Sequence, residues 1–359
     1  MSVSPAHALI NAGHAADLAL GAAVLGSGGG GDTRTGAAAI AAALGAGDSV
    51  PLVPAAAVGP DAWVAGVMAV GATSVMLERL PSGDEFTAAV RALQRHAGVR
   101  LDAVLGMEGA GANALLSVLC AHWLNLPLID ADGMGRAFPR IEQTIFTAAG
   151  IRAAPLVLAN STADIMIIEA GSNASVERLA RAALPALGGW AAATGYLMRG
   201  RDCAAHAITG TFSRALAIGA AIRRARLGGP AGPAGEGPIR EAGGHLVFEG
   251  VVIEVWQRTS LGPGTVTLEH RGNRRRALRV ELADELLLAI EDGAVAAAVP
   301  DIICALDSRR LTPVGADSIT TGQELDIWRF AAPDAWYRPP GAGLVGLPAF
   351  GLAPVDWLA

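Results

Sequence analysis

Short apolar runs alternate with longer stretches of helical spacing through the first two-thirds of the chain. The apolar runs predict buried strands, and apolar residues three and four apart predict helices between them. The expected strands are 50–53, 63–70, 101–106, 127–130, 155–159 and 165–169, and the expected helices are 83–96, 112–124, 176–187 and 212–227. This alternation is typical of an α/β fold, in which helices cover both faces of a mainly parallel sheet.

The N-terminal segment shows a helical pattern that ends at a run of glycines. Ser4 and Pro5 predict a helix start, because serine caps a helix and proline fits its first position. The apolar residues from Leu9 to Leu25 then predict one continuous helix, stopped by the glycine-rich segment 26–31. A second helix is expected from Thr35 to Leu44.

The pattern changes after a segment rich in glycine and proline at 228–238. Such a segment lacks core-forming residues and is typical of a loop or linker. Beyond it, short strands separated by turns are expected at 245–257, 265–269, 277–282, 302–306 and 325–330. We therefore expect a layered α/β domain over residues 1–230 and a smaller β-rich domain over residues 240–359.

Composition narrows the classes of function and location. Hydrophobic residues make up 52% of the chain, which supplies a large core, and the net charge of −6 argues against a nucleic-acid binder. The apolar stretch 62–77 is too short and too interrupted for a membrane span. The N-terminus lacks a basic region and carries Asp17 in its apolar part, so we expect no signal peptide and a cytoplasmic protein. Three widely separated cysteines predict no disulfide framework.

The glycine-rich segment formally matches the dinucleotide-binding pattern G-x-G-x-x-G. That site needs a preceding strand, and the preceding residues here predict a helix, so no nucleotide is expected. Consecutive glycines do leave backbone N–H groups free to line a pocket for an anionic or carbonyl-bearing ligand. The expected ligand-binding residues are Gly28, Gly29, Gly30, Gly31 and the adjoining Asp32. The alternative is a helix–helix turn in which Asp32 is a helix cap.

A second candidate cluster, Glu108 to Asn113, lies where a predicted strand ends and a predicted helix begins. Open α/β sheets bind their ligands at this edge, so the Glu108 carboxyl would be accessible to a substrate. The alternative is that Glu108 is an ordinary acid in the first turn of a helix, favoured by the helix dipole.

A third cluster follows the next predicted strand and contains Asp130, Asp132 and Arg136. The two carboxylates could bind a divalent metal through oxygen, or one could be a general base. The planar guanidinium of Arg136 suits a carboxylate or imide oxygen. The alternative is an internal Asp–Arg bridge that shapes the loop. The seven histidines lack the H-x-H and H-E-x-x-H spacings, so the His-rich metal centre of amidohydrolase-type hydantoinases is not expected.

Five segments together resemble the family typified by bacterial S-methyl thiohydantoin desulfurases, which are often encoded beside hydantoinase/oxoprolinase subunits. They are LGSGGGGD (25–32), EGAGAN (108–113), LPLIDADGMGRAFP (126–139), VPDII (299–303) and LVGLPAFG (344–351). The resemblance implies an α/β layer domain followed by a smaller β-rich domain. The chain departs from the family pattern at Ala110, where a glycine is usual, at Asp284 before Glu285, where asparagine is usual, and at Leu347 before Pro348.

The resemblance implies hydrolysis of a hydantoin-like ring. Water would attack the carbon that bears the S-methyl group, and methanethiol would leave. Glu108, Asp130 and Asp132 would supply the base, a second acid or metal ligands, and Asn113 and Arg136 would orient the ring. Hydantoinase/oxoprolinase subunits are the implied protein partners, and we expect a homo-oligomer. Two alternatives remain open, a non-catalytic partner of such an assembly and an amidase or decyclase that acts on another ring.

Overall fold

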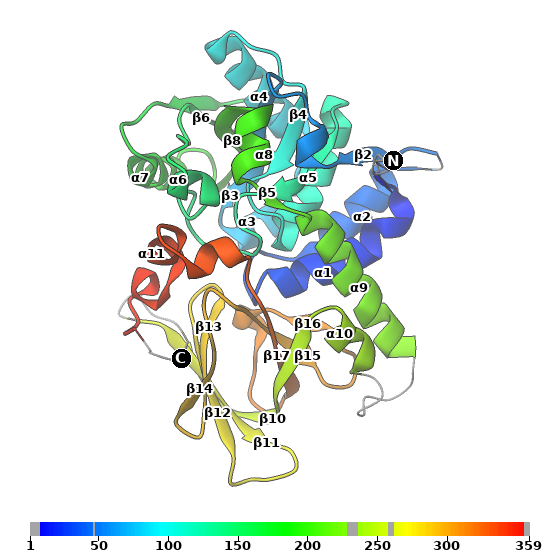
Figure 1. Ribbon diagram of the computed structural model, residues 1–359, viewed down its shortest axis with the longest axis vertical. Helices are drawn as coiled ribbons and strands as arrows, with labels where there is room; N and C mark the ends of the chain where they lie inside the picture. The colour runs from blue at the N-terminus through cyan, green and yellow to red at the C-terminus, as the bar shows by residue number, and fades with distance from the viewer. Residues whose placement is uncertain (1–7, 46, 228–235, 258–261, 355–359) are drawn as a thin grey trace.

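The computed structural model describes residues 8–45, 47–227, 236–257 and 262–354, and it contains two β-sheets that follow one another along the chain. The strands of the first sheet lie before residue 210, and those of the second lie after residue 243. Figure 1 shows the first sheet in the upper half and the second in the lower half, with helices α1 and α11 between them. Ser4 and Pro5 lie outside the described residues.

The first sheet has a parallel centre with antiparallel strands on both sides. In spatial order its strands are β1 (Ala8–Ile10), β2 (Val50–Val53), β5 (Leu128–Asp132), β4 (Ala103–Gly106), β3 (Trp63–Gly71), β8 (Trp190–Arg199), β6 (Leu156–Ala159) and β7 (Ile165–Ile168), and β9 (Ile208–Thr209) pairs with β5. Strands β2, β5, β4 and β3 pair in parallel, as the alternating pattern predicts. The sequence did not reveal β8, which joins β3 to β6 by antiparallel pairing.

Helices cover this sheet, most of them near the predicted positions, although those at 73–78, 145–148 and 200–206 were not predicted. They are α1 (Ala15–Leu25), α2 (Thr33–Ala43), α3 (Thr73–Glu78), α4 (Asp84–Ala97), α5 (Gly111–Leu124), α6 (Ile145–Ala148), α7 (Asn173–Ala183), α8 (Gly200–His206) and α9 (Thr211–Leu227), with short 3-10 turns at Ala12–His14 and Ala55–Ala57. The prediction of one helix from Leu9 to Leu25 is wrong. Residues 8–10 pair with the free edge of β2, which satisfies their backbone groups and buries Ile10.

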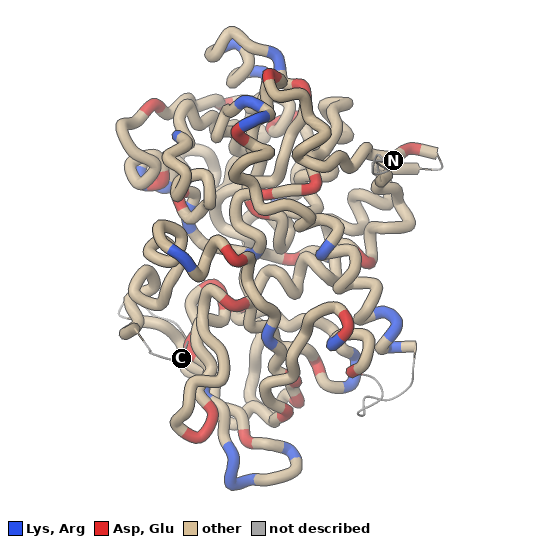
Figure 2. The backbone as a smooth tube through the Cα atoms, in the orientation of Figure 1, with Lys and Arg blue, Asp and Glu red and all other residues tan. Residues whose placement is uncertain are grey.

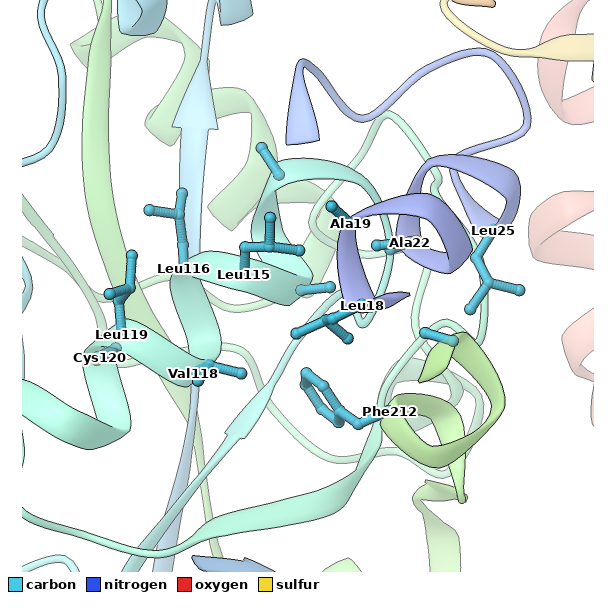
Figure 3. Close-up of a cluster of buried hydrophobic side chains, with 14 of the residues drawn as sticks. Leu18, Ala19, Ala22, Leu25, Leu115, Leu116, Val118, Leu119, Cys120 and Phe212 are labelled. Carbon is cyan, nitrogen blue, oxygen red and sulfur yellow. The ribbon is translucent and has the colours of Figure 1, made fainter. Parts of the chain in front are cut away.

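Helices α1, α5 and α9 form a compact layer on one side of the sheet (Figure 3). Leu18 and Ala22 of α1 lie between Leu115 of α5 and Phe212 of α9, and all four side chains are buried. Helices α1 and α9 approach so closely that a Cβ at Gly21 would lie 1.7 Å from the Ala215 carbonyl oxygen. Glycine at position 21 therefore allows α1 to pack closely against α9, and this packing positions the glycine-rich loop that follows α1.

The second sheet is antiparallel throughout, which confirms the predicted β-rich C-terminal part. In spatial order its strands are β14 (Ala294–Ala298), β13 (Leu286–Glu291), β12 (Ala277–Leu282), β11 (Gly264–His270), β10 (Gly244–Trp256), β17 (Glu324–Phe330), β15 (Ile302–Asp307) and β16 (Pro313–Val314). Helix α10 (Gly237–Glu241) and a short 3-10 turn (Ala316–Ser318) adjoin it. Strands β13, β14 and β16 were not predicted.

The last described segment returns to the first domain. It contains 3-10 turns at Asp334–Tyr337 and Leu347–Phe350 on either side of α11 (Gly341–Val345). The indole nitrogen of Trp336 donates to the carbonyl of Met134 at 2.7 Å, and the ring contacts Phe138 edge-on. The C-terminal segment therefore covers the loop that follows β5.

Charged residues of both signs are spread over the two halves of the molecule (Figure 2). The arginines of the turn between β11 and β12 form ion pairs with neighbouring acids, Arg271 with Asp326 and Arg276 with Glu291. These ion pairs offset part of the positive charge of the turn. In the described part of the chain, we find no helix with the length and apolar character that a membrane crossing requires.

Candidate functional site

Charged side chains are buried where the first sheet meets the second domain. Glu108 follows β4, Asp132 ends β5, and Arg136 lies in the loop after β5. Glu285 comes just before β13 and Asp301 just before β15. None of these five residues is more than 4% exposed. Burying so many ionisable groups is costly unless they are paired, so this junction is the candidate site.

Adjacent parallel strands position the acids of the first domain. In the pairing of β4 with β5, Gly106 lies opposite Asp132, so Glu108 and Asp132 emerge at the same edge of the sheet. The two carboxyl groups are close enough for the charge of Asp132 to raise the pKa of Glu108. The acids expected to meet at this edge were Glu108 and Asp130, and the structure brings Asp132 to Glu108 instead.

The Glu108 carboxyl is buried and hydrogen-bonded to Asn113. The Nδ2 group of Asn113, in the first turn of α5, donates to Oε2 of Glu108 at 2.5 Å. The Oδ1 atom of Asn113 accepts from the N–H of Ala69 at 2.7 Å, which fixes the orientation of the amide. Burial raises the pKa of Glu108 to about 8, although the Asn113 hydrogen bond acts in the opposite direction. Glu108 can therefore gain or lose a proton near neutral pH.

The Asp132 carboxyl holds three segments together. Its oxygens accept hydrogen bonds from the N–H of Gly109 at 2.6 Å, the N–H of Gly135 at 2.8 Å and the hydroxyl of Thr211 at 2.8 Å. Burial raises the pKa of Asp132 to about 6, and these hydrogen bonds oppose that shift. The loop that carries Glu108, the loop after β5 and the start of α9 all depend on this side chain.

Asp130 lies apart from this group, at the start of α9. Its Oδ1 accepts from the N–H groups of Phe212 and Ser213 at 3.0 and 3.1 Å, and its Oδ2 accepts from the Ser213 hydroxyl at 2.5 Å. An acid that accepts from the first N–H groups of a helix stabilises that helix end. The structure therefore brings Asp132 to Glu108 and directs Asp130 to α9.

Arg136 extends into the second domain. Its Nε donates to the carbonyl of Ala137 at 3.1 Å, and its Nη1 donates to the carbonyls of Pro300 and Asp301 at 2.9 and 2.5 Å. Its Nη2 is buried without a hydrogen-bond partner. Burial lowers the pKa of Arg136 to about 10, while the nearby acids, Glu285 first, act to raise it. The alternative of an internal Asp–Arg bridge is wrong, because the guanidinium binds carbonyls of the other domain.

The glycine-rich loop lies between the two domains, and its residues 28–32 are partly exposed. The carbonyl of Gly30 accepts from Ala112 at 2.7 Å, and that of Gly28 accepts from Ala316 at 2.8 Å. A Cβ at Gly30 would lie 2.9 Å from the Cα of Gly111, so only glycine allows this approach. The predicted role of the loop as a wall of the site remains a proposal.

Asp32 caps the helix that follows the loop. Its Oδ1 accepts from the N–H of Arg34 at 2.8 Å, and its Oδ2 forms an ion pair with the Arg34 guanidinium at 2.9 Å. The hydrogen bond from Arg34 lowers the pKa of Asp32. This is the geometry that the helix-cap alternative predicts.

Sequence reasoning missed the contribution of the second domain. Asp301 accepts a hydrogen bond from the Tyr337 hydroxyl and lies 2.8 Å from the Nε of Arg329. Glu285 is 3% exposed, and burial raises its pKa to about 8. Asp301 lies in VPDII and Glu285 follows the unusual Asp284, so both lay in segments that the sequence marked. Each of these acids directly precedes an apolar segment, and this is the feature that could have identified them. Nothing in the sequence indicated that either one lies near Glu108.

A metal centre is not visible in the arrangement of the described residues. No group of three or more His, Cys, Asp or Glu side chains there is placed to hold a metal ion. The carboxylates of Asp130 and Asp132 accept N–H and hydroxyl hydrogen bonds instead. The junction does contain two glutamates, Glu108 and Glu285, whose pKa values burial raises to about 8, and the guanidinium of Arg136 lies beside them.

Comparisons with known proteins cover both domains. Residues 14–170 match the family model described as S-Me-THD-like, N-terminal domain, and residues 171–358 match the one described as S-Me-THD-like, C-terminal domain. The chain is also similar to a protein of Chromobacterium violaceum solved by X-ray crystallography. The two share 23% identity with a TM-score of 0.80 over 97% of this chain and 100% of that chain, a likeness that shows the fold. No curated protein matches the chain.

Proposed function

The chain belongs to the S-Me-THD-like family, and we propose that it hydrolyses the carbon–sulfur bond of an S-methyl thiohydantoin or a related five-membered cyclic amide. The observation that carries this proposal is the buried Glu108 carboxyl beside the fixed guanidinium of Arg136. Burial raises the pKa of Glu108 to about 8, which suits a group that must both accept and return a proton near neutral pH.

The reaction adds one water and releases methanethiol. The water oxygen attacks the ring carbon that carries sulfur, and the ionised Glu108 accepts one water proton. The electron pair of the carbon–nitrogen double bond moves to the ring nitrogen, which then takes that proton. When the tetrahedral intermediate collapses, the carbon–sulfur bond breaks, the second water proton passes to sulfur, and a ring carbonyl remains. The products are methanethiol and a hydantoin.

The other site residues have supporting roles in this proposal. Asn113 fixes the Glu108 carboxyl through its amide, and Asp132 fixes the adjacent Gly109. Arg136 supplies a positive charge where negative charge develops on the ring in the transition state. Asp130 stabilises the start of α9. The hydroxyl of Thr211, in the first turn of this helix, donates a hydrogen bond to Asp132. The prediction that Asp132 is itself the base is tested below.

The purified chain should release methanethiol from S-methyl thiohydantoin, measured with a thiol reagent. Glu108→Gln keeps the size of the side chain and removes its proton exchange, so kcat should fall by roughly 10²-fold or more. Glu281→Gln is a matched control, because Glu281 is a buried acid of the second domain that pairs with Arg279. A wild-type protein that releases no thiol from this ring or related rings would favour the non-catalytic partner.

A further inference from the structure

In the described part of the junction, two buried polar atoms have neither a hydrogen bond nor an ion-pair partner, whereas Asp301 Oδ2 and Arg329 Nε form an ion pair with each other. Among the described residues, Arg136 Nη2 and Glu285 Oε2 are buried and make no hydrogen bond. The two residues are 0% and 3% exposed. Gly29 lies against Glu285, and the adjoining Gly30 lies against Ala137, the residue after Arg136, so the two side chains are neighbours. No nitrogen–oxygen pair within 4.0 Å connects them. Buried polar atoms almost always have a partner, so two neighbouring exceptions indicate a place that a ligand completes.

Both groups are held in place by the protein. The other nitrogens of Arg136 donate to the carbonyls of Ala137, Pro300 and Asp301, which fixes the plane of the guanidinium. Glu285 packs against the glycine-rich loop, where a Cβ at Gly29 would lie 2.9 Å from its Oε1. The two unpartnered atoms therefore belong to side chains that the protein itself holds in place, one from each domain.

The chemistry of the pair defines the ligand. Arg136 Nη2 can only donate a hydrogen bond, and an ionised Glu285 can only accept one. A ligand that binds the ionised form of Glu285 must therefore present an acceptor beside a donor on the same edge. The C=O and N–H of an ordinary peptide are trans and point in opposite directions, whereas a five-membered ring holds its amide cis. A lactam or imide ring has the required edge.

We propose that Arg136 and Glu285 bind the cis-amide edge of a cyclic amide, with the ring carbonyl accepting from Nη2 and the ring N–H donating to Oε2. The ring size rests on the proposed function, but the binding does not require turnover. It makes Glu285 a residue that determines which rings enter the site.

The charge of the junction favours a neutral ligand over a carboxylate. Four acids, Glu108, Asp132, Glu285 and Asp301, lie there with two arginines, Arg136 and Arg329. Since burial raises the pKa of Glu285 to about 8, this group is largely protonated at pH 7 in the free protein. A ring N–H would stabilise the carboxylate and displace its proton. A ligand carboxylate would instead keep Glu285 protonated.

Isothermal titration calorimetry of hydantoin into the full chain tests this difference. At pH 7, in two buffers that differ in ionisation enthalpy, binding should release protons, approaching one per ring bound. Glu285→Gln should weaken binding about tenfold or more and abolish the proton release. Glu281→Gln should change neither. 1,3-Dimethylhydantoin, which lacks the N–H, should bind wild type and Glu285→Gln equally weakly.

Equal hydantoin affinity for wild type and Glu285→Gln, proton uptake on binding, or no binding to wild type would overturn the proposal. If Glu285→Gln does not fold, Glu285→Asp can replace it. This variant keeps the carboxylate but shortens the side chain by one methylene, so it should show the same loss of hydantoin affinity. Hydantoin binding with proton release but no methanethiol production would remove only the proposed function. Methanethiol production with unchanged binding to Glu285→Gln would remove only this inference.

Discussion

Ser27 and Ile303 exchange hydrogen bonds across the two domains. The Ser27 hydroxyl donates to the Ile303 carbonyl at 2.8 Å and accepts from the Ile303 N–H at 3.1 Å. The Ser27 carbonyl also accepts from the N–H of Leu286 at 2.7 Å. These hydrogen bonds attach the glycine-rich loop of the first domain to β15 and to the segment that carries Glu285. Ser27 therefore helps to hold the two domains together at the candidate site.

Ser27→Ala should destabilise the protein. It leaves the buried N–H and carbonyl of Ile303 without their partner, which typically costs about 1–3 kcal/mol in the free energy of unfolding. Urea unfolding measures the loss. Ser74→Ala is the control, because Ser74 is exposed on α3 and should show no change. Identical midpoints for Ser27→Ala and wild type would show that the connection does not contribute.

Stability should fall as pH rises from about 5 to about 8, the interval between the unfolded and folded pKa values of the buried glutamates. Burial raises the pKa of Glu108 and of Glu285 from 4.5 to about 8. In this interval the folded protein keeps protons that the unfolded chain has released. The stabilisation from each group is complete below the unfolded pKa and is lost as pH passes the folded one, by at most about 1.4 kcal/mol per pH unit.

Urea unfolding of wild type, Glu108→Gln and Glu285→Gln at several pH values measures this slope. Each glutamine variant should show a shallower decline, because one titrating group has been removed. Parallel curves for all three proteins would contradict the assignment of the titration to these residues.

Asp132→Asn should lower the free energy of unfolding and leave the activity of the folded protein largely intact. Both carboxylate oxygens accept hydrogen bonds, whereas an amide offers one oxygen and turns donor N–H groups toward Gly109, Gly135 or Thr211. We expect a loss of about 1–3 kcal/mol in the free energy of unfolding and activity per folded molecule within tenfold of wild type. Melting temperature and methanethiol release are measured on the same preparation. A stable protein whose turnover has dropped by roughly 10² would make Asp132 the base.

Gly29→Ala should impair ligand binding while the protein stays folded. The new Cβ would lie 2.9 Å from Glu285 Cγ and Oε1 and from the Asp284 carbonyl oxygen, so Glu285 must move. Gly29 does not have a positive φ, so alanine suits its backbone dihedrals, and the contact with the Asp284 carbonyl requires only a local backbone shift. Hydantoin affinity should fall about tenfold, as for Glu285→Gln. Gly45→Ala, whose Cβ would meet nothing within 4 Å, should bind as wild type does.

The sequence alone predicted most strands and helices of both sheets, because periodic burial within one element is recorded in that element's own residues. Because parallel strands end on the same side of a sheet, it also predicted that the motifs after β4 and β5 meet at one edge, but it paired Glu108 with Asp130 rather than with Asp132. It misjudged residues 8–10, whose helical spacing yields to pairing with the open edge of β2.

Only the tertiary structure decided how the acids differ. Asp130 and Asp132 are two residues apart and look equivalent in sequence. Asp130 accepts from Phe212 and Ser213 at the start of α9, whereas Asp132 accepts from Thr211 and also from the loops after β4 and β5. Glu285 reaches the site through the docking of the second domain on the glycine-rich loop. The hydrophobic periodicity of the sequence indicates which face of a helix or strand is buried, but it does not indicate which other element covers that face. The donors, acceptors and charges that surround a carboxyl, and hence its pKa, therefore come from contacts between distant segments.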